Sequence, residues 1–165
     1  MIIQEDDLEF NFSDAIDAIK FDDQEHALAH CMKAVDFIVE LSEVYIFVEV
    51  KDPSHPQALV HNDVAEFQEK TTSGKLREDL VKKFRDSFVY RWAEEKLEKP
   101  IHYLSLITIE EALLSNFQDD LQQHLPFSGP ARWARPIVRS CHAINIEAWN
   151  RNFPKWPVRR LSEAT

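Results

Sequence analysis

Glycine is scarce in this chain, with two residues in 165. Glycine-rich phosphate-binding loops need several glycines, because backbone amides must approach the phosphate closely. The sequence contains neither the dinucleotide-binding fingerprint nor the Walker A pattern, so the nucleotide-binding classes that depend on them are excluded.

Cysteine, long apolar runs and an N-terminal basic region are also lacking. The two cysteines, Cys31 and Cys141, do not indicate a disulfide framework. No segment approaches the roughly 18 uninterrupted apolar residues that cross a membrane. The first seven residues hold no basic residue of the kind that opens a signal peptide. We therefore expect a cytoplasmic protein with no membrane partner.

Basic residues are outnumbered, with 19 Lys and Arg against 29 Asp and Glu, which gives a net charge of −10. The charge is uneven, because residues 126–165 carry a net +5 and residues 1–125 a net −15. Cations beside aromatic rings suit phosphate contacts and base stacking. The basic segment 126–165 therefore predicts nucleic-acid contacts through Arg132, Arg135 and Arg139. The alternative is that its tryptophans are core residues and its arginines pair with the acidic part of the chain.

A length of 165 residues and ordinary apolar content favour a single α/β domain. We expect residues 1–10 to be an N-terminal extension of this domain. The apolar spacing predicts helices over residues 14–21, 75–96 and 110–125, and strands over 34–40, 45–51, 102–109 and 137–149.

The strands over 34–40 and 45–51 are the most informative part of the chain, because they predict a β-hairpin around the turn 41–44. If the turn closes symmetrically, paired residue numbers sum to 85 and Asp36 lies opposite Glu49. One face is then wholly apolar and must face the core; it consists of Val35, Phe37, Val39, Ile46, Val48 and Val50. The other face carries Asp36, Glu49 and Lys51.

Two carboxylates directly opposite each other repel by roughly 0.2–1 kcal/mol. A Mg²⁺ or Mn²⁺ ion between Asp36 and Glu49 would offset this repulsion, since both cations prefer oxygen ligands. Lys51 lies on the same face, where its ammonium group can orient water or stabilise charge on a phosphate. The alternative is a partly exposed hairpin face on which the acids and the lysine form ordinary salt bridges.

The spacing Asp36, twelve residues, then Glu49-Val50-Lys51 within an apolar hairpin resembles the PD-(D/E)XK, or restriction-endonuclease-like, nuclease superfamily. The resemblance implies a mixed central β-sheet flanked by helices. It also implies that Asp36 and Glu49 bind Mg²⁺ or Mn²⁺, with the carbonyl of Val50 as a further metal ligand, and that Lys51 is catalytic. Val35 stands where the motif's proline would be, a common departure in this superfamily.

The resemblance implies a metal-dependent nuclease that acts on nucleic acid, and we expect DNA. An additional acid often precedes the hairpin, and Asp14 and Asp17 are candidates. The helix over 75–96 is expected to supply a polar or basic side chain, but the sequence does not choose between Lys83 and Arg91. The loop 52–56 leaves directly from the site, so His55 is a candidate substrate contact.

The acidic surface predicts weak binding of the isolated chain to DNA, so we expect a homodimer or a partner subunit. Two alternatives remain open. A catalytically silent interaction or adaptor protein would keep the nuclease fold and use the acids as salt-bridge partners. A metalloenzyme of another class, such as a phosphatase, would use the same acids on a small phosphate ester.

Overall fold

The described residues form two β-sheets. The computed structural model describes residues 1–55 and 63–163. The smaller sheet has the antiparallel order β1-β2-β8, and the larger has the order β3-β4-β5-β6-β7. In the larger sheet β3, β4 and β5 are antiparallel neighbours, whereas β5, β6 and β7 run parallel. The strands are β1 Ile2–Glu5, β2 Leu8–Asn11, β3 Asp17–Lys20, β4 Phe37–Glu40, β5 Tyr45–Lys51, β6 Ile101–Ile107, β7 Ser140–Ile144 and β8 Val158–Arg160.

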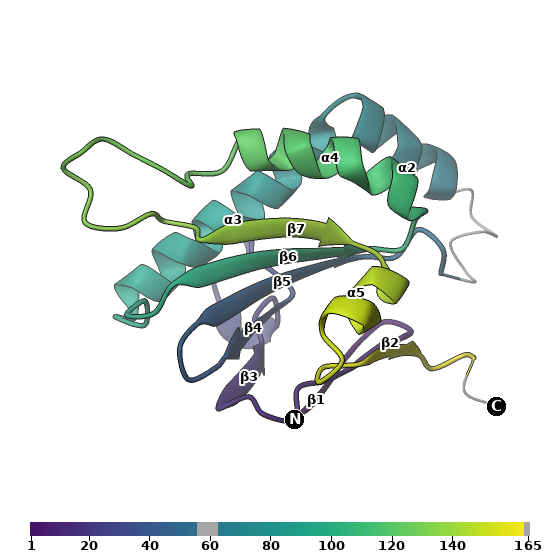
Figure 1. Ribbon diagram of the computed structural model, residues 1–165, viewed down its shortest axis with the longest axis horizontal. Coiled ribbons are helices and arrows are strands. Elements are labelled where there is room, and N and C mark those ends of the chain that lie inside the picture. The colour runs from purple at the N-terminus through teal and green to yellow at the C-terminus, as the bar shows by residue number, and fades with distance from the viewer. Residues whose placement is uncertain (56–62, 164–165) are drawn as a thin grey trace.

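Helices cover the larger sheet, which gives the expected α/β class with a mixed sheet. The helices are α2 Asp63–Thr72, α3 Lys75–Ala93, α4 Glu111–Gln123 and α5 Ile146–Asn152, with a short 3₁₀ turn, η1, at Gln24–His26. In Figure 1, α3 and α4 lie on one side of the larger sheet, and α5 lies on the other side with the smaller sheet. Gly74 separates α2 from α3 with a φ of 79°, a left-handed conformation that glycine adopts without steric cost. No helix in the described ranges is long and apolar enough to cross a membrane.

The predicted hairpin register is confirmed. Phe37 pairs with Val48 and Val39 with Ile46, so paired residue numbers sum to 85. The apolar face of the hairpin packs against the smaller sheet and α5, where Trp149 is fully buried. Burial of each large apolar side chain contributes about 1.5–3 kcal/mol, which makes a slip of register costly.

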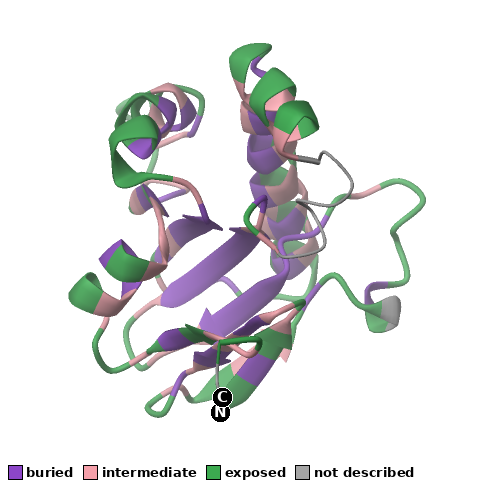
Figure 2. Cartoon of the chain, turned by 90° about the vertical axis from the view of Figure 1, so that its right-hand side faces the viewer, coloured by how far each residue is buried: buried purple, intermediate pink, exposed green. Residues whose placement is uncertain are grey.

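The opposite face of the hairpin is largely buried as well, and of its charged residues only Lys51 and Glu40 keep about 30% of their side chains exposed. Ile38 and Phe47 on this face pack against α3 and α4, and Val35 joins them instead of the apolar face. Figure 2 shows the central strands buried and the outer faces of the helices exposed. A strand that is covered on both faces reads as a nearly continuous apolar run, so an acid within it is conspicuous.

Three local expectations are corrected. Residues 1–10 are not an extension, because β1 and β2 pair and bury Leu8 and Phe10. The helix predicted over 14–21 is instead β3, in which Ile19 pairs with Ile38; this long-range pairing overrides the helical spacing of its apolar residues. The strand predicted over 137–149 ends at Ile144. There the Asn145 side chain accepts a hydrogen bond from the Ala148 amide at 2.9 Å and caps α5.

Candidate active site

Asp36 and Glu49 converge at the end of the hairpin. Asp36 directly precedes β4 and Glu49 lies within β5. Continuing the observed register by one pair places the two residues opposite each other. Oδ2 of Asp36 accepts a hydrogen bond from the Val50 amide at 2.6 Å, which holds the carboxylate against β5. Both acids are buried, with exposed fractions of 4% for Asp36 and 0% for Glu49.

Two lysines neutralise these acids. The Lys51 ammonium lies 2.6 Å from Oε1 of Glu49. The Lys83 ammonium, which comes from α3, lies 2.6 Å from the same oxygen and 3.1 Å from Oδ1 of Asp36. Lys83 is therefore the basic residue that the helix supplies. Arg91 instead pairs with Glu94, the residue that follows the helix, at 2.8 Å.

Burial and the charges of neighbouring groups shift the pKa values of Glu49 and Lys83. Burial raises the pKa of Glu49 to about 7, and repulsion from Asp36 adds to the rise, whereas Lys51 and Lys83 oppose it. Burial alone would lower the pKa of Lys83, but the charges of Glu49 and Asp36 outweigh it and leave the pKa raised. Oε2 of Glu49 is buried and has no hydrogen-bond partner among the described residues. An unpaired buried carboxylate oxygen is costly, so this atom is suited to a further cationic ligand.

Two more acids lie beside Asp36, and neither was a candidate from the sequence. Carboxylate oxygens of Glu5, Asp22 and Asp36 lie within 4.8 Å of one another. Partial burial and the charge of Asp36 raise the pKa of Asp22 to about 6. Lys20 pairs with Glu5 at 2.8 Å. The signal that could have found both acids is their place at strand ends, since Glu5 ends β1 and Asp22 follows β3 closely.

The earlier candidates for an additional acid lie elsewhere. Asp14 accepts a hydrogen bond from the Trp156 indole, and Asp17 pairs with Glu40 at the other end of β4. Neither is part of the three-carboxylate group beside Asp36.

The donor set fits a divalent metal ion. Glu5, Asp22 and Asp36 form one group of carboxylates, and Lys83 joins Asp36 to Glu49; three ammonium groups, those of Lys20, Lys51 and Lys83, pair with members of this set of four acids. Hard cations such as Mg²⁺ and Mn²⁺ take such oxygens. The surplus of acid and the unpaired oxygen of Glu49 are the observations on which this fit depends. The carbonyl of Val50 as a ligand stays a prediction.

Arg160 anchors the loop that follows Lys51. Its guanidinium donates to both oxygens of Asp52, at 2.8 and 2.6 Å, and the Thr108 hydroxyl donates to the same carboxylate at 2.5 Å. The His55 amide donates to the carbonyl of Asp52 at 3.1 Å, so His55 follows the site closely along the chain. Its contact with substrate stays a prediction, and residue 56 of this loop lies outside the described residues.

The predicted basic contacts Arg132, Arg135 and Arg139 are not brought to the site. Arg135 donates to the carbonyls of Leu97 and Glu98, and the Arg139 amide donates to the carbonyl of Ile101. Ile101 pairs with Tyr45, at the opposite end of β5 from Lys51, which is about 20 Å away at roughly 3.3 Å per residue. Arg132 is exposed in the loop between α4 and β7.

Other residues of segment 126–165 have the structural roles of the alternative interpretation, in which tryptophans lie in the core and arginines pair with acids. Trp149 is fully buried, and three arginines pair with acids from earlier in the chain. These pairs are Arg151 with Glu111, Arg159 with Glu9, and Arg160 with Asp52 and Asp7.

A lysine-lined cavity opens beside the cluster. Its volume is about 450 Å³, and its lining includes the basic residues Lys33, Lys51, Lys70 and Lys83. Glu66 and Asp79 also line it, and Lys70 pairs with Glu66 at 2.6 Å. Lysine ammonium groups are mobile point charges that bind phosphate oxygens. We call this cavity the lysine pocket.

A comparison of the chain with known protein families, curated proteins and solved structures found no match. The functional argument therefore depends on the geometry and chemistry of the cluster itself.

Proposed function

We propose that this chain is a metal-dependent nuclease with a restriction-endonuclease-like core, which hydrolyses phosphodiester bonds in nucleic acid. The observation that carries the proposal is the convergence of Asp36, Glu49, Lys51 and Lys83 at one end of the hairpin. Two buried acids that face each other beside an open, lysine-lined cavity suit a bound metal and a phosphate better than they suit a core.

The architecture supports the proposal. The acidic hairpin lies in a mixed sheet between antiparallel and parallel strands, and helices flank that sheet. Such a sheet is what the resemblance to the PD-(D/E)XK superfamily implies. Helix α3, between β5 and β6 in the chain, delivers Lys83 to the acids.

Each side chain has a role in the proposed reaction. Asp36 and Glu49 would hold Mg²⁺ or Mn²⁺, and Asp22 and Glu5 add carboxylates beside Asp36. A metal ion bound there would supply an activated water and neutralise charge on the phosphate. Lys51 orients the attacking water or stabilises the charge that develops on the scissile phosphate. Lys83 contacts both acids and sets their spacing.

One observation favours the second candidate, a catalytically silent adaptor. Lys51 and Lys83 already pair with Asp36 and Glu49 within hydrogen-bonding distance. Acids that are paired in this way have their buried charges compensated without a metal. The net charge of −10 suits a basic protein partner, and the same acidic surface is the reason that we propose a homodimer or partner subunit for binding of DNA.

The test is cleavage of plasmid and of single-stranded DNA in Mg²⁺ or Mn²⁺. The intact protein is compared with Asp36→Asn, Glu49→Gln and Lys51→Ala. Glu40→Gln is the matched control, since Glu40 lies in the same hairpin and pairs with Lys99 at 2.6 Å, far from the cluster. We expect cleavage that requires metal, disappears in the three variants and persists in the control. A small phosphate ester serves as the substrate that identifies a phosphatase.

Metal binding separates the outcomes when the intact protein cuts no DNA. Calorimetry measures whether the intact protein binds Mn²⁺ and whether this binding is lost in Asp36→Asn. Binding without cleavage means that a partner subunit or another nucleic acid is needed. If the protein neither binds Mn²⁺ nor cleaves DNA, the nuclease function is contradicted and the adaptor is supported.

A further inference from the structure

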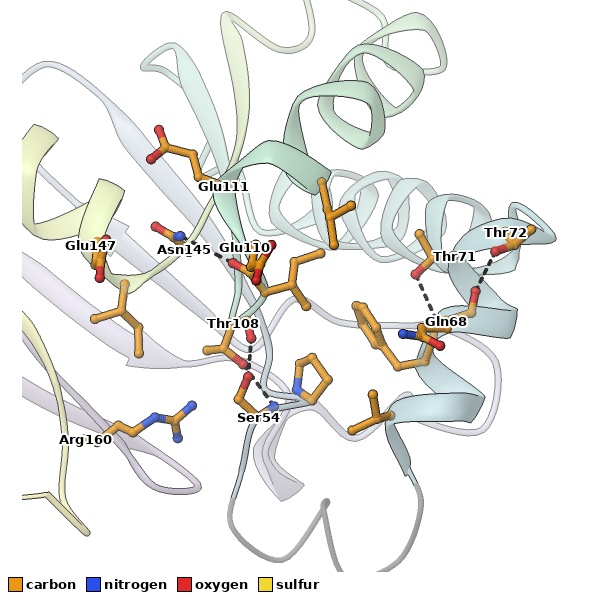
Figure 3. Close-up of a pocket in the computed structure, with 16 residues that line it drawn as sticks. Ser54, Gln68, Thr71, Thr72, Thr108, Glu110, Glu111, Asn145, Glu147 and Arg160 are labelled. Carbon is orange, nitrogen blue, oxygen red and sulfur yellow. Dashed lines mark hydrogen bonds between the residues drawn. The ribbon is translucent and has the colours of Figure 1, made fainter.

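A second, larger groove lies where the carboxyl ends of β5 and β6 meet α2, α4 and α5. Its volume is about 1130 Å³, which exceeds the roughly 300–1,000 Å³ typical of small-molecule sites and leaves room for a nucleotide. Figure 3 shows Ser54, Thr108 and Asn145 on the strand side of the groove, with Gln68 and Thr71 across it on α2. We call it the second groove.

The lining of the second groove combines apolar walls with uncharged polar groups. The apolar part consists of Pro53, Val64, Phe67, Ile109, Leu113 and Ile146. The polar part includes the Gln68 amide and the Thr71 and Thr72 hydroxyls. A flat aromatic base needs such a surface, because its faces stack on apolar and aromatic side chains while its edge forms hydrogen bonds.

The second groove and the lysine pocket share two lining residues, Pro53 and Phe67. They are therefore adjacent, and Phe67 lies between them. A phosphate held by Lys51 and Lys83 would place its neighbouring nucleotide against Phe67. The Phe67 side chain is partly buried against the helix-side core, so its ring is held in place as a stacking platform.

The charge around the second groove opposes a passing phosphate backbone. Glu110, Glu111 and Glu147 line it and are exposed. Arg160, the only arginine or lysine in its lining as described, already pairs with Asp52 and Asp7. A neutral base enters such a groove at less electrostatic cost than a duplex, whose phosphates carry a high charge density.

From this arrangement we infer that the second groove binds an unpaired nucleobase next to the scissile phosphate. The substrate is then a single strand, or a strand end or loop whose base is out of the stack, because a base within a duplex cannot reach the groove. The inference rests on the proposed nuclease function for the identity of the phosphate in the lysine pocket. To that function it adds the class of nucleic acid that the site accepts, namely one with an unpaired base.

The test measures binding of fluorescein-labelled oligothymidine by anisotropy, with Ca²⁺ in place of Mg²⁺. The same strand annealed to oligoadenosine and a strand of abasic residues are the comparison probes. We expect the single strand to bind about tenfold more tightly than the abasic strand, since stacking contributes about 1–3 kcal/mol per base. The single strand should also bind more tightly than the duplex.

Phe67→Leu keeps the apolar packing of the side chain but removes the aromatic face. It should bind oligothymidine about tenfold more weakly, whereas Phe67→Tyr should retain affinity. Phe88→Leu is the matched control, because Phe88 packs on the same core from the opposite end of the sheet. Circular dichroism verifies that each variant folds.

The outcomes separate the inference from the nuclease function. Equal affinity for single strand, duplex and abasic strand, or no loss in Phe67→Leu, overturns the inference. So does an absence of binding to every probe. Plasmid cleavage without preference for unpaired bases leaves the nuclease standing and removes the base site. Base-dependent binding without cleavage and without Mn²⁺ binding leaves the base site standing and removes the nuclease.

Discussion

The Lys83 ammonium lies 2.6 Å from Oε1 of Glu49, a residue whose side chain is fully buried within β5. The same ammonium lies 3.1 Å from Oδ1 of Asp36. One cation from α3 therefore holds together two acids that the hairpin places opposite each other. Any divalent ion that binds these oxygens competes with Lys83, and this competition is measurable.

Lys83→Met should lower the free energy of unfolding by about 3 kcal/mol, because it leaves two buried acids without their shared cation. Mg²⁺ or Mn²⁺ should raise the unfolding midpoint more in this variant than in the intact protein, since the cation no longer competes with an ammonium group. Urea unfolding in chelator and in metal measures both effects.

Lys99→Met is the control for this variant. Lys99 pairs with Glu40, and both side chains are about a quarter exposed, so its loss should cost about 1 kcal/mol or less and give no response to metal. Equal losses in the two variants would contradict a special role for Lys83.

Glu49→Gln should flatten the pH dependence of stability in chelator. The ordinary pKa of a glutamate is 4.5, and burial, with Asp36, raises that of Glu49 to about 7. Between these values the folded protein binds a proton that the unfolded chain releases. The free energy of unfolding therefore falls as pH rises from 4.5 to 7, by up to about 1.4 kcal/mol per pH unit.

The glutamine variant cannot take up this proton, so its slope should be smaller over the same range. Urea unfolding at several pH values, for both proteins, measures the difference. The same slope in the two proteins would mean that Glu49 is ionised throughout the range.

Arg160→Lys should loosen the loop after Lys51. Arg160 donates two hydrogen bonds to Asp52, and both side chains are nearly buried. Lysine cannot reproduce this two-pronged contact, so we expect a loss of about 1–3 kcal/mol in the free energy of unfolding. Hydrogen exchange of the amides of residues 52–55 should be faster.

Arg159→Lys is the adjacent control. Arg159 is 64% exposed and pairs with Glu9, so its replacement should change stability by less than about 0.5 kcal/mol. If the two variants lose the same stability, Arg160 does not anchor the loop.

A thiol reagent should distinguish the two cysteines. Cys31 is exposed, whereas Cys141 is buried in β7, and burial raises the pKa of its thiol to about 12. The thiolate is the reactive form, so at pH 8 one thiol should react in the folded protein and two in denaturant. Mass spectrometry of the labelled peptides identifies the site. Rapid labelling of Cys141 in the folded protein would show that β7 opens easily.

The hairpin was predictable because its information is local. Alternation of side chains along adjacent strands determines which residues share a face, so the pairing of Val39 with Ile46 followed from the residue order alone. The same alternation identified Asp36, Glu49 and Lys51 as a group. The helix predicted over residues 14–21 was wrong, because the strand pairing of Ile19 with Ile38 overrides the local helical spacing of the apolar residues.

The rest of the cluster depends on how distant segments pack. Helix α3 carries several cations, and only its orientation on the sheet selects Lys83 over Arg91. Asp22 and Glu5 reach Asp36 because strands far apart in the chain end at the same place. Packing also keeps Arg135 away from the site. Arg135 contacts the residues just before β6, and the start of β6 pairs with the start of β5, whereas Lys51 lies at the other end of β5.

The sequence by itself determined the α/β class, the register of the hairpin, and the grouping of two acids and one lysine, because each depends on a periodicity that residue order carries. Only the tertiary structure places Lys83 as the second lysine of the cluster and brings Glu5 and Asp22 beside Asp36. It also forms the Arg160 contact that anchors the loop and the groove beside Phe67. Those features join residues that lie tens of positions apart, and only the packing of helices and strands around the core brings such residues together.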